Sequence, residues 1–105
     1  MALTRDFKAT VKARAERDPK FRAALLTEAV DQMLSGDVKT GKAVLRDYIN
    51  ATVGFERLAR ETGTPAKSLM RMFGPKGNPR ADNLFAVINR LQRASGVRLG
   101  VAAAR

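Results

Sequence analysis

The chain has 105 residues, with 20 Lys and Arg against 10 Asp and Glu, a formal net charge of +10, and no cysteine or histidine. This length favours one compact domain, and the lack of a long apolar run argues against a membrane span or a signal peptide, so we expect a cytoplasmic protein with no membrane partner. Because cysteine and histidine supply the commonest nucleophiles, general bases and transition-metal ligands, their absence argues against an enzyme. We predict no catalytic residue, no metal ligand and no cofactor.

The positive charge is concentrated in the second half of the chain. Residues 1–54 carry ten positive and seven negative side chains, whereas residues 55–105 carry ten positive and only three negative. A basic composition often reflects nothing more than a well-solvated surface. Solvation gives no reason to gather one sign in one half, so the asymmetry indicates a polyanionic partner, nucleic acid rather than a membrane surface.

The apolar residues follow a helical period almost from end to end, which predicts an all-α bundle of five to six helices. Three of the four prolines follow a residue that is favourable at a helix N-cap, in the pairs Asp18-Pro19, Thr64-Pro65 and Asn78-Pro79. A cap side chain accepts from a free backbone N–H, and proline suits the first helical position. Each pair therefore predicts a helix start.

Three helices are expected before residue 53. The first spans about Arg5 to Arg17 and is weakly amphipathic, and the third follows Asp37 and runs to about Thr52. The second begins at Pro19 and carries a broad apolar stripe, made of Phe21, Leu25, Leu26, Ala29, Val30, Met33 and Leu34. A stripe of that width predicts a helix packed against the core.

Three more helices are expected after Gly54. They cover about Phe55 to Thr62, Pro65 to Phe73, and a longer segment from Pro79 onward. The apolar residues of the last helix predict a core face formed by Leu84, Phe85, Ile88 and Leu91.

The C-terminal tail, residues 96–105, has a different pattern. Val97, Leu99 and Val101 alternate with Arg98 and Gly100, which is the period of a half-buried strand. Such a strand has no partner in a helical chain, so either it pairs with the same strand of a second subunit or the tail is only loosely packed. Both alternatives stay open.

Residues 55–74 have the spacing of a helix-turn-helix unit. Ala59 allows close approach of the second helix, Gly63 follows four residues later where the first helix ends, and Leu69 follows after six more to lock the helices together. The short connection between the helices also suits the motif. Two short helices with a glycine corner also occur in many proteins that bind no DNA, so the spacing alone does not decide between these functions.

The outward face of the second helix of this unit is positive. If Leu69 points inward, the helical period places Lys67 and Arg71 on the opposite side, with Met70 beside them and Ala66 and Ser68 at the margins. Lys and Arg can bond guanine or phosphate, Ser can bond phosphate or base, and Met or Ala can touch a thymine methyl group.

The acids of the preceding helix are expected to be occupied. Glu56 lies four residues before Arg60, and Arg57 lies four residues before Glu61, so each acid has a partner on its own helix. This leaves the charges on the second helix available to an external anion.

The loop that follows extends the positive surface. Lys76 and Arg80 flank the expected helix start at Asn78-Pro79, where free N–H groups favour a phosphate, and Arg90 and Arg93 continue the charge. An exposed helix suggests duplex DNA. Single-strand binding needs aromatic platforms, and Phe55, Phe73 and Phe85 are all expected on core faces.

The segment "GFERLARETGTPAKSLMRMFGPKGNPRADNLFAVINRLQ", residues 54–92, resembles the lambda-repressor-like helix-turn-helix proteins. Within them it is similar to the antidote, or antitoxin, transcriptional regulators of bacterial addiction modules, and the lead-in "GKAVLRDYINATVGF" and the tail extend the similarity over most of residues 20–101. The resemblance implies a lambda-repressor-like bundle as a single domain over residues 1–105, with N-terminal helices at 5–52, the motif at 55–74 and the tail at 96–105.

The resemblance also implies a function. Such proteins are homodimers that repress their own operon at a palindromic double-stranded operator and bind a small cognate toxin, usually a basic ribonuclease. Carried onto this sequence, the DNA-binding residues are Ala66, Lys67, Ser68, Met70 and Arg71, to which the loop analysis adds Lys76 and Arg80.

One feature departs from the antitoxin pattern. A basic toxin favours an acidic patch, and the only clustered candidates are Glu28, Asp31, Asp37 and Asp47. Three interpretations therefore remain: the antitoxin and autorepressor of a toxin–antitoxin module, a stand-alone or prophage-derived repressor without a toxin, and a nonspecific DNA-binding protein.

Overall fold

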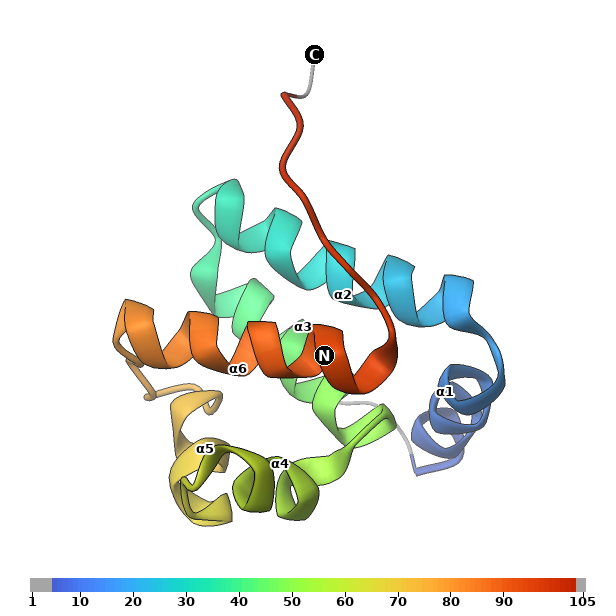
Figure 1. Cartoon of the computed structure of the whole chain (residues 1–105), viewed down its shortest axis with the longest axis horizontal. Helices are drawn as coiled ribbons and strands as arrows, with labels where there is room; N and C mark the ends of the chain where they lie inside the picture. Colours follow the sequence, from blue (N-terminus) through green and yellow to red (C-terminus); the bar gives the residue numbers. More distant parts are fainter. Residues whose placement is uncertain (1–4, 104–105) are drawn as a thin grey trace.

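The computed structural model describes residues 5–103 and is all-helical, as the sequence predicts (Figure 1). Its elements are α1 (Arg5–Arg17), α2 (Pro19–Leu34), α3 (Val38–Ala51), α4 (Gly54–Thr62), α5 (Ala66–Met72) and α6 (Ala81–Ser95). The predicted tail, residues 96–105, is thus described as far as residue 103. None of the helices within the described range is both long enough and apolar enough to cross a bilayer.

The starts of α2 and α3 are set by acidic caps. The Asp18 carboxylate accepts from the N–H groups of Lys20 and Phe21 at 3.0 and 3.2 Å, and Pro19 occupies the first turn, as predicted. The hydrogen bond from Phe21 is the main cause that lowers the pKa of Asp18. Asp37 caps α3 by accepting from the N–H of Thr40 at 3.1 Å.

The core forms where α2, α3 and α4 meet α5 and α6. Its fully buried members include Leu26, Leu45, Tyr48, Leu58, Leu69 and Leu91. Helices α2 and α3 approach each other closely at Gly41, where a Cβ would collide with the Met33 side chain and lie 2.9 Å from the Ala29 carbonyl oxygen. Glycine is therefore required at this helix crossing.

Arg22 ties the ends of three helices together. Its guanidinium donates to the carbonyl oxygen of Ala15 near the end of α1, at 2.7 Å, and to that of Ser95 at the end of α6, at 3.4 Å. The last carbonyls of a helix have no partner within the helix, so one cation satisfies two helix ends at once.

Two of the three predicted helix starts are wrong. Helix α5 begins at Ala66 rather than Pro65, and α6 begins at Ala81 rather than Pro79, in both cases without a side-chain cap. Proline fixes φ but not ψ. Pro65 has ψ 143°, and Arg80 after Pro79 has ψ 151°, so both stretches are extended where a helix was expected.

Two apolar residues expected in the core are exposed. Leu34, the last residue of α2, is 66% exposed, and Phe85 is 62% exposed. The buried face of α6 is set by Val87, Ile88 and Leu91, and Leu84 is partly buried. Since each residue turns about 100° around a helix, Phe85 rotates out of this face.

The C-terminal tail contains no strand among residues 97–103, so the strand expected there is absent from this single chain. Gly96 ends α6 in the left-handed conformation, with φ 67°, and Val97 is buried. The N–H of Leu99 donates to the side-chain oxygen of Gln92 at 2.8 Å, in place of a strand partner. Beyond Leu99 the tail leaves the body of the molecule, and Val101 is 87% exposed (Figure 1).

Candidate nucleic-acid interface

The corner between α4 and α5 has the predicted construction. Gly63 adopts the left-handed conformation, with φ 75°, and its N–H donates to the Ala59 carbonyl oxygen at 2.9 Å. The Thr62 hydroxyl donates to the Leu58 carbonyl oxygen at 2.8 Å and accepts from the N–H of Thr64 at 3.3 Å. These bonds fix the turn, and a side chain other than glycine at residue 63 would be strained.

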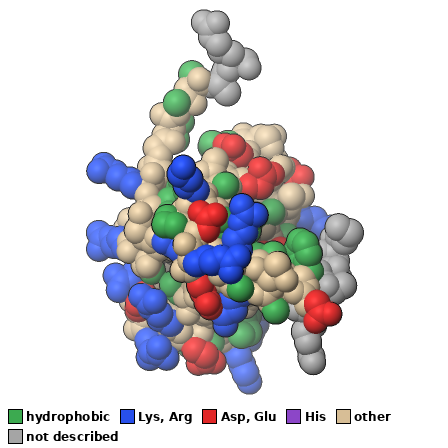
Figure 2. Space-filling model, turned by 90° about the vertical axis from the view of Figure 1, so that its right-hand side faces the viewer, with side chains coloured by type: hydrophobic (Ala, Val, Ile, Leu, Met, Phe, Trp, Pro, Cys, Tyr) green, Lys and Arg blue, Asp and Glu red, His purple; other side chains and the backbone are tan. Residues whose placement is uncertain are grey.

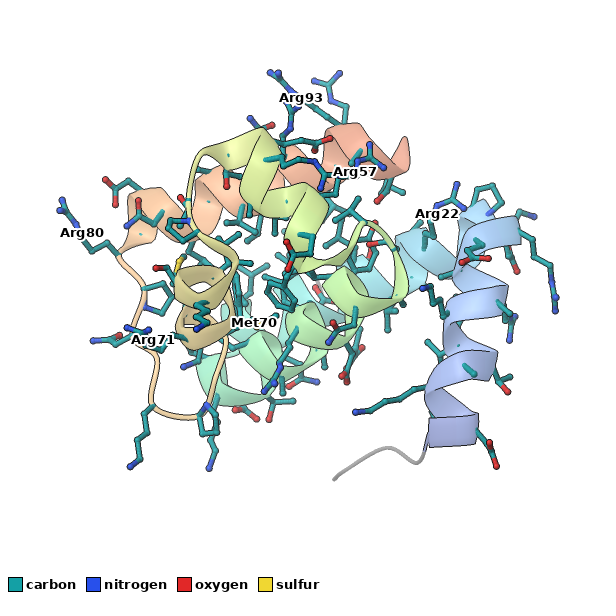
Figure 3. The ribbon with its side chains drawn as sticks, turned by 90° about the horizontal axis from the view of Figure 1, so that it is seen from below. Arg22, Arg57, Met70, Arg71, Arg80 and Arg93 are labelled. Atoms are coloured by element: carbon teal, nitrogen blue, oxygen red, sulfur yellow. The ribbon has the colours of Figure 1, made fainter. Side chains whose placement is uncertain are left out.

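Helix α5 is docked by one face and open on the other. Leu69 is buried in the core, and Phe73 follows it there directly after the helix. On the opposite side Lys67 and Arg71 are exposed and Met70 is 42% exposed, as the helical period predicts. Met70 and Arg71 are labelled on α5 in Figure 3. Ala66 and Ser68 lie half-buried at the margins.

The two cations of α5 are available to a ligand. Across residues 5–103, neither Lys67 nor Arg71 forms an ion pair with an acid. Their helix is only seven residues long, so the exposed face is a compact surface with charge beside an apolar methionine.

The loop from residue 73 to 80 is held close to α5 by a lysine of α3. The ammonium group of Lys42, on α3, donates to the carbonyl oxygens of Gly74, at 3.3 Å, and Gly77. The Lys42 side chain is almost fully buried, at 7% exposure. At Gly77 the loop passes so close to α5 that a Cβ would collide with the carbonyl oxygens at the end of the helix.

Lys42 was not among the predicted site residues, although the sequence contains a signal for it. It lies three residues before Leu45 and seven before Ile49, both buried, and so it falls on the core stripe of α3. A lysine on such a stripe must find acceptors inside the fold, because a buried unpaired charge is costly.

Three of the predicted site residues meet at one hollow. Ser68, Arg71 and Lys76 line a depression of about 320 Å³ together with Met72 and residues 77–79. The loop therefore brings Lys76 to the side of α5 that carries Arg71.

Arg80 lies on the same side of the molecule as Arg71, as Figure 3 shows. Its guanidinium is 3.6 Å from the Asp82 carboxylate, but both side chains are mostly exposed. Such a surface pair contributes little to stability and is easily exchanged for another anion. Arg80 thus remains a candidate for phosphate binding.

The helix start expected at Asn78-Pro79 lies two residues further along the chain, at Ala81. Because α6 begins at Ala81, its free N–H groups follow Arg80, and the N–H of Asn83 donates to the Asp82 carboxylate at 3.0 Å. One N–H group in the first turn of α6 is thus already paired with a carboxylate.

Glu61 joins α4 to α6 and pairs with one of the predicted surface cations, Arg90. It accepts from Arg57 at 2.9 Å, as predicted, and from Arg90 at 3.1 Å. The bond from Arg57, supported by that from Arg90, lowers the pKa of the Glu61 carboxyl. Arg90 is therefore engaged rather than free, and Arg93 lies with Arg57 on another edge of the molecule (Figure 3). The expected pair of Glu56 with Arg60 does not form between these described side chains.

This arrangement suits binding of an extended anion. Exposed Lys and Arg side chains on a short projecting helix can reach phosphates and base edges, while Met70 offers an apolar contact. Comparison with protein-family models, with curated proteins and with solved structures found no match to this chain.

Proposed function

We propose that this protein is a sequence-specific DNA-binding repressor that inserts α5 into the major groove. The observation that carries the proposal is the outward face of α5, a helix fixed by a glycine corner. There Lys67 and Arg71 are exposed and have no acidic partner among the residues that the structure describes. Lys and Arg donate to the O6 and N7 atoms of guanine, and Met70 fits a thymine methyl group.

The loop and the margins of α5 supply the contacts that position the helix. Lys76 and Ser68 lie beside Arg71 in the same hollow, and Arg80 lies close by on the same side. Phosphate contacts of this kind set the register of a protein on the duplex without reading sequence. Ala66 completes the set as a small side chain at the start of the helix.

The experiment that tests this proposal uses the DNA upstream of the gene as a candidate operator. We expect Lys67→Ala and Arg71→Ala each to weaken binding by about 1–3 kcal/mol, or about 5- to 150-fold, and to relax base preference. Fluorescence anisotropy titration gives the affinities, and thermal unfolding shows that the fold is retained. Lys20→Ala, which removes an exposed lysine on α2, is the matched control.

Wild-type affinity in both α5 variants would rule out the site. Equal binding of the wild-type protein to the operator and to unrelated DNA would favour the nonspecific DNA-binding alternative instead.

An antitoxin role is the second candidate, in which the repressor also binds a small basic ribonuclease-like toxin. It is favoured by the exposed acids Glu28 and Asp31 on α2, next to the exposed Leu34. Figure 2 shows acidic side chains gathered near the top of the molecule, where α2 lies in Figure 1. Asp37 is already used as a cap, and Asp47 lies half-buried near Lys8 and Arg46.

The stand-alone repressor has the same DNA site but no such partner. A small basic protein that is encoded by the neighbouring reading frame and binds through Glu28 and Asp31 would separate the two roles. We also propose that the protein acts as a homodimer, since helix-turn-helix repressors read half-sites about one helical turn apart.

A further inference from the structure

A second group of cations lies on α3 and α1, outside the predicted site. Lys39 and Arg46 are exposed on α3, and Lys8 is exposed on α1. These side chains line a hollow of about 290 Å³ whose wall also includes Phe73, Gly74 and Pro75 from the end of α5 and the loop. Buried Lys42 contributes to the same wall.

The charge of this hollow is positive and largely uncommitted. Four cations among residues 5–103 line it against one acid, Asp47. Among residues 5–103, Lys8, Lys39 and Arg46 take part in no ion pair within 4.0 Å. Lys42 is the exception in the wall, because its ammonium group is engaged with the loop carbonyls.

Asp47 does not cancel this charge. Burial raises the pKa of its carboxyl, while the charges of Lys8 and Arg46 act in the opposite direction. One carboxylate between two cations leaves the wall with an excess of positive charge, and Asn50 adds a neutral polar side chain.

The hollow continues along the crossing of α1 and α3. A neighbouring depression of about 360 Å³ shares Lys8, Asp47 and Asn50 with it and adds Lys12. Together the two depressions form a groove, which we call the α1–α3 groove. A groove that runs between two helices and is lined by cations fits a chain of phosphates better than a single small anion.

The loop after α5 connects this groove to the proposed reading surface. Gly74 and Pro75 border the α1–α3 groove, whereas Lys76 and the residues after it border the hollow beside Arg71. A DNA strand that extends beyond the surface of α5 would therefore pass the loop and then reach the α1–α3 groove. Seen from below in Figure 3, α3 lies between α5 and α1.

The spacing of the α3 cations suits a nucleic-acid backbone. Lys39 and Arg46 are seven residues apart, two turns of helix, so they share one face at a separation of roughly 10.5 Å along the axis. Two long, flexible side chains at that distance can reach phosphates of the same strand.

We infer that the α1–α3 groove binds backbone phosphates of the DNA next to the segment that α5 reads. The inference rests on the proposed function, and it assigns Lys39, Arg46 and Lys8 as phosphate contacts that extend the footprint. Such contacts add affinity and salt dependence but no base preference.

The salt dependence of operator binding tests the inference. In the Lys39→Ala/Arg46→Ala double variant, the slope of log Kobs against log salt concentration should fall in magnitude by about 1.8, or about 0.9 for each phosphate that the protein no longer neutralises. Base preference should stay as in the wild-type protein. Hydroxyl-radical footprinting should show weaker protection at one edge of the site and unchanged protection at its centre.

The control removes the same charge elsewhere. Arg17→Ala/Lys20→Ala deletes two exposed cations where α1 meets α2, on the opposite side of the molecule from α5 (Figure 1). The salt-dependence slope and the footprint of this control variant should equal those of the wild-type protein. Circular dichroism checks the fold of each variant. Arg46→Gln, which keeps most of the side-chain stem, is a milder substitution and should reduce the salt-dependence slope by about half as much as the double variant does.

The outcomes separate the two proposals. An unchanged slope and footprint in the folded double variant, or an equal reduction in the control, would overturn the groove and leave α5 as the reading helix. If the wild-type protein binds no duplex DNA, both the groove and the proposed function fail.

Discussion

Lys42 holds the loop from residue 73 to 80 in position. It is a buried cation whose partners are two backbone carbonyl oxygens, those of Gly74 and Gly77, more than thirty positions later in the chain. Hydrogen bonds that involve a charged donor are stronger than neutral ones, and a carbonyl left without its donor loses that stabilisation. Lys42 is thus a positioning residue that acts through the loop.

We expect Lys42→Met to loosen the loop while keeping the aliphatic volume in the wall of α3. The loss of the charge-assisted bonds should lower the free energy of unfolding by about 1–3 kcal/mol. Urea denaturation followed by circular dichroism measures this change. Lys39→Met, an exposed lysine one turn earlier on the same helix, should leave the free energy of unfolding unchanged.

A double variant separates loop positioning from charge removal. If Lys42→Met acts through Lys76, combining it with Lys76→Ala should weaken DNA binding by less than the sum of the two single effects. Strictly additive losses together with unchanged stability in Lys42→Met would contradict the role assigned to Lys42.

At the scale of helices, the sequence predicts what depends on local pattern and misses what depends on distant contacts. All six helices were expected, because their apolar period and the caps at Asp18 and Asp37 are local features. The start after Thr64 was placed one residue too early because the proline ring leaves ψ undetermined and Pro65 is extended. The start after Asn78 was placed two residues too early because Arg80 is also extended.

In the candidate site, too, the sequence predicts the features that depend on local pattern and misses those that depend on distant contacts. The exposed face of α5 follows from the helical period alone, so Lys67, Met70 and Arg71 were placed correctly. The engagement of Arg90 by Glu61 and the burial of Lys42 connect residues about 30 positions apart. No local pattern encodes such pairs, although the stripe of α3 marks Lys42 as inward-facing.

The crossing of α2 and α3 gives a prediction at this scale. Gly41→Ala places a methyl group against the Met33 side chain, which can move, and 2.9 Å from the Ala29 carbonyl oxygen, which cannot move without its helix. We expect a loss of about 1–3 kcal/mol in the free energy of unfolding, the usual effect of overpacking. Thermal and urea unfolding measure it.

Gly100→Ala is the matched control for this variant, since a Cβ there meets no atom within 4 Å. Equal stability of Gly41→Ala and Gly100→Ala would show that the two helices can separate without cost, contrary to the close packing described.

At the scale of the whole molecule, the chain is a compact body with a projecting tail. The Cα radius of gyration of 13.1 Å is that of an ordinary domain of this length. Val101 stands 87% exposed at the end of a segment whose first residue, Val97, is buried. An apolar residue presented in this way favours contact with a second chain.

We expect deletion of residues 96–105 to convert a dimer to a monomer, because Val101 on the exposed tail offers an apolar contact to a second copy. Light scattering after size-exclusion chromatography measures the mass. Val101→Asp is the milder change, which leaves Val97 in the core. A dimer mass that persists in both variants would place the dimer contact elsewhere.

The bond between Gln92 and Leu99 has a geometric consequence for such a dimer. It fixes the first residues of the tail to α6, so the direction in which the tail departs is a property of that helix rather than of the tail. Helix α6 is joined in turn to α4 through Arg90 and Glu61. In two copies linked through their tails, this series of contacts would set the distance between the two α5 helices. The same contacts would then set the spacing of the two half-sites that such a dimer could bind.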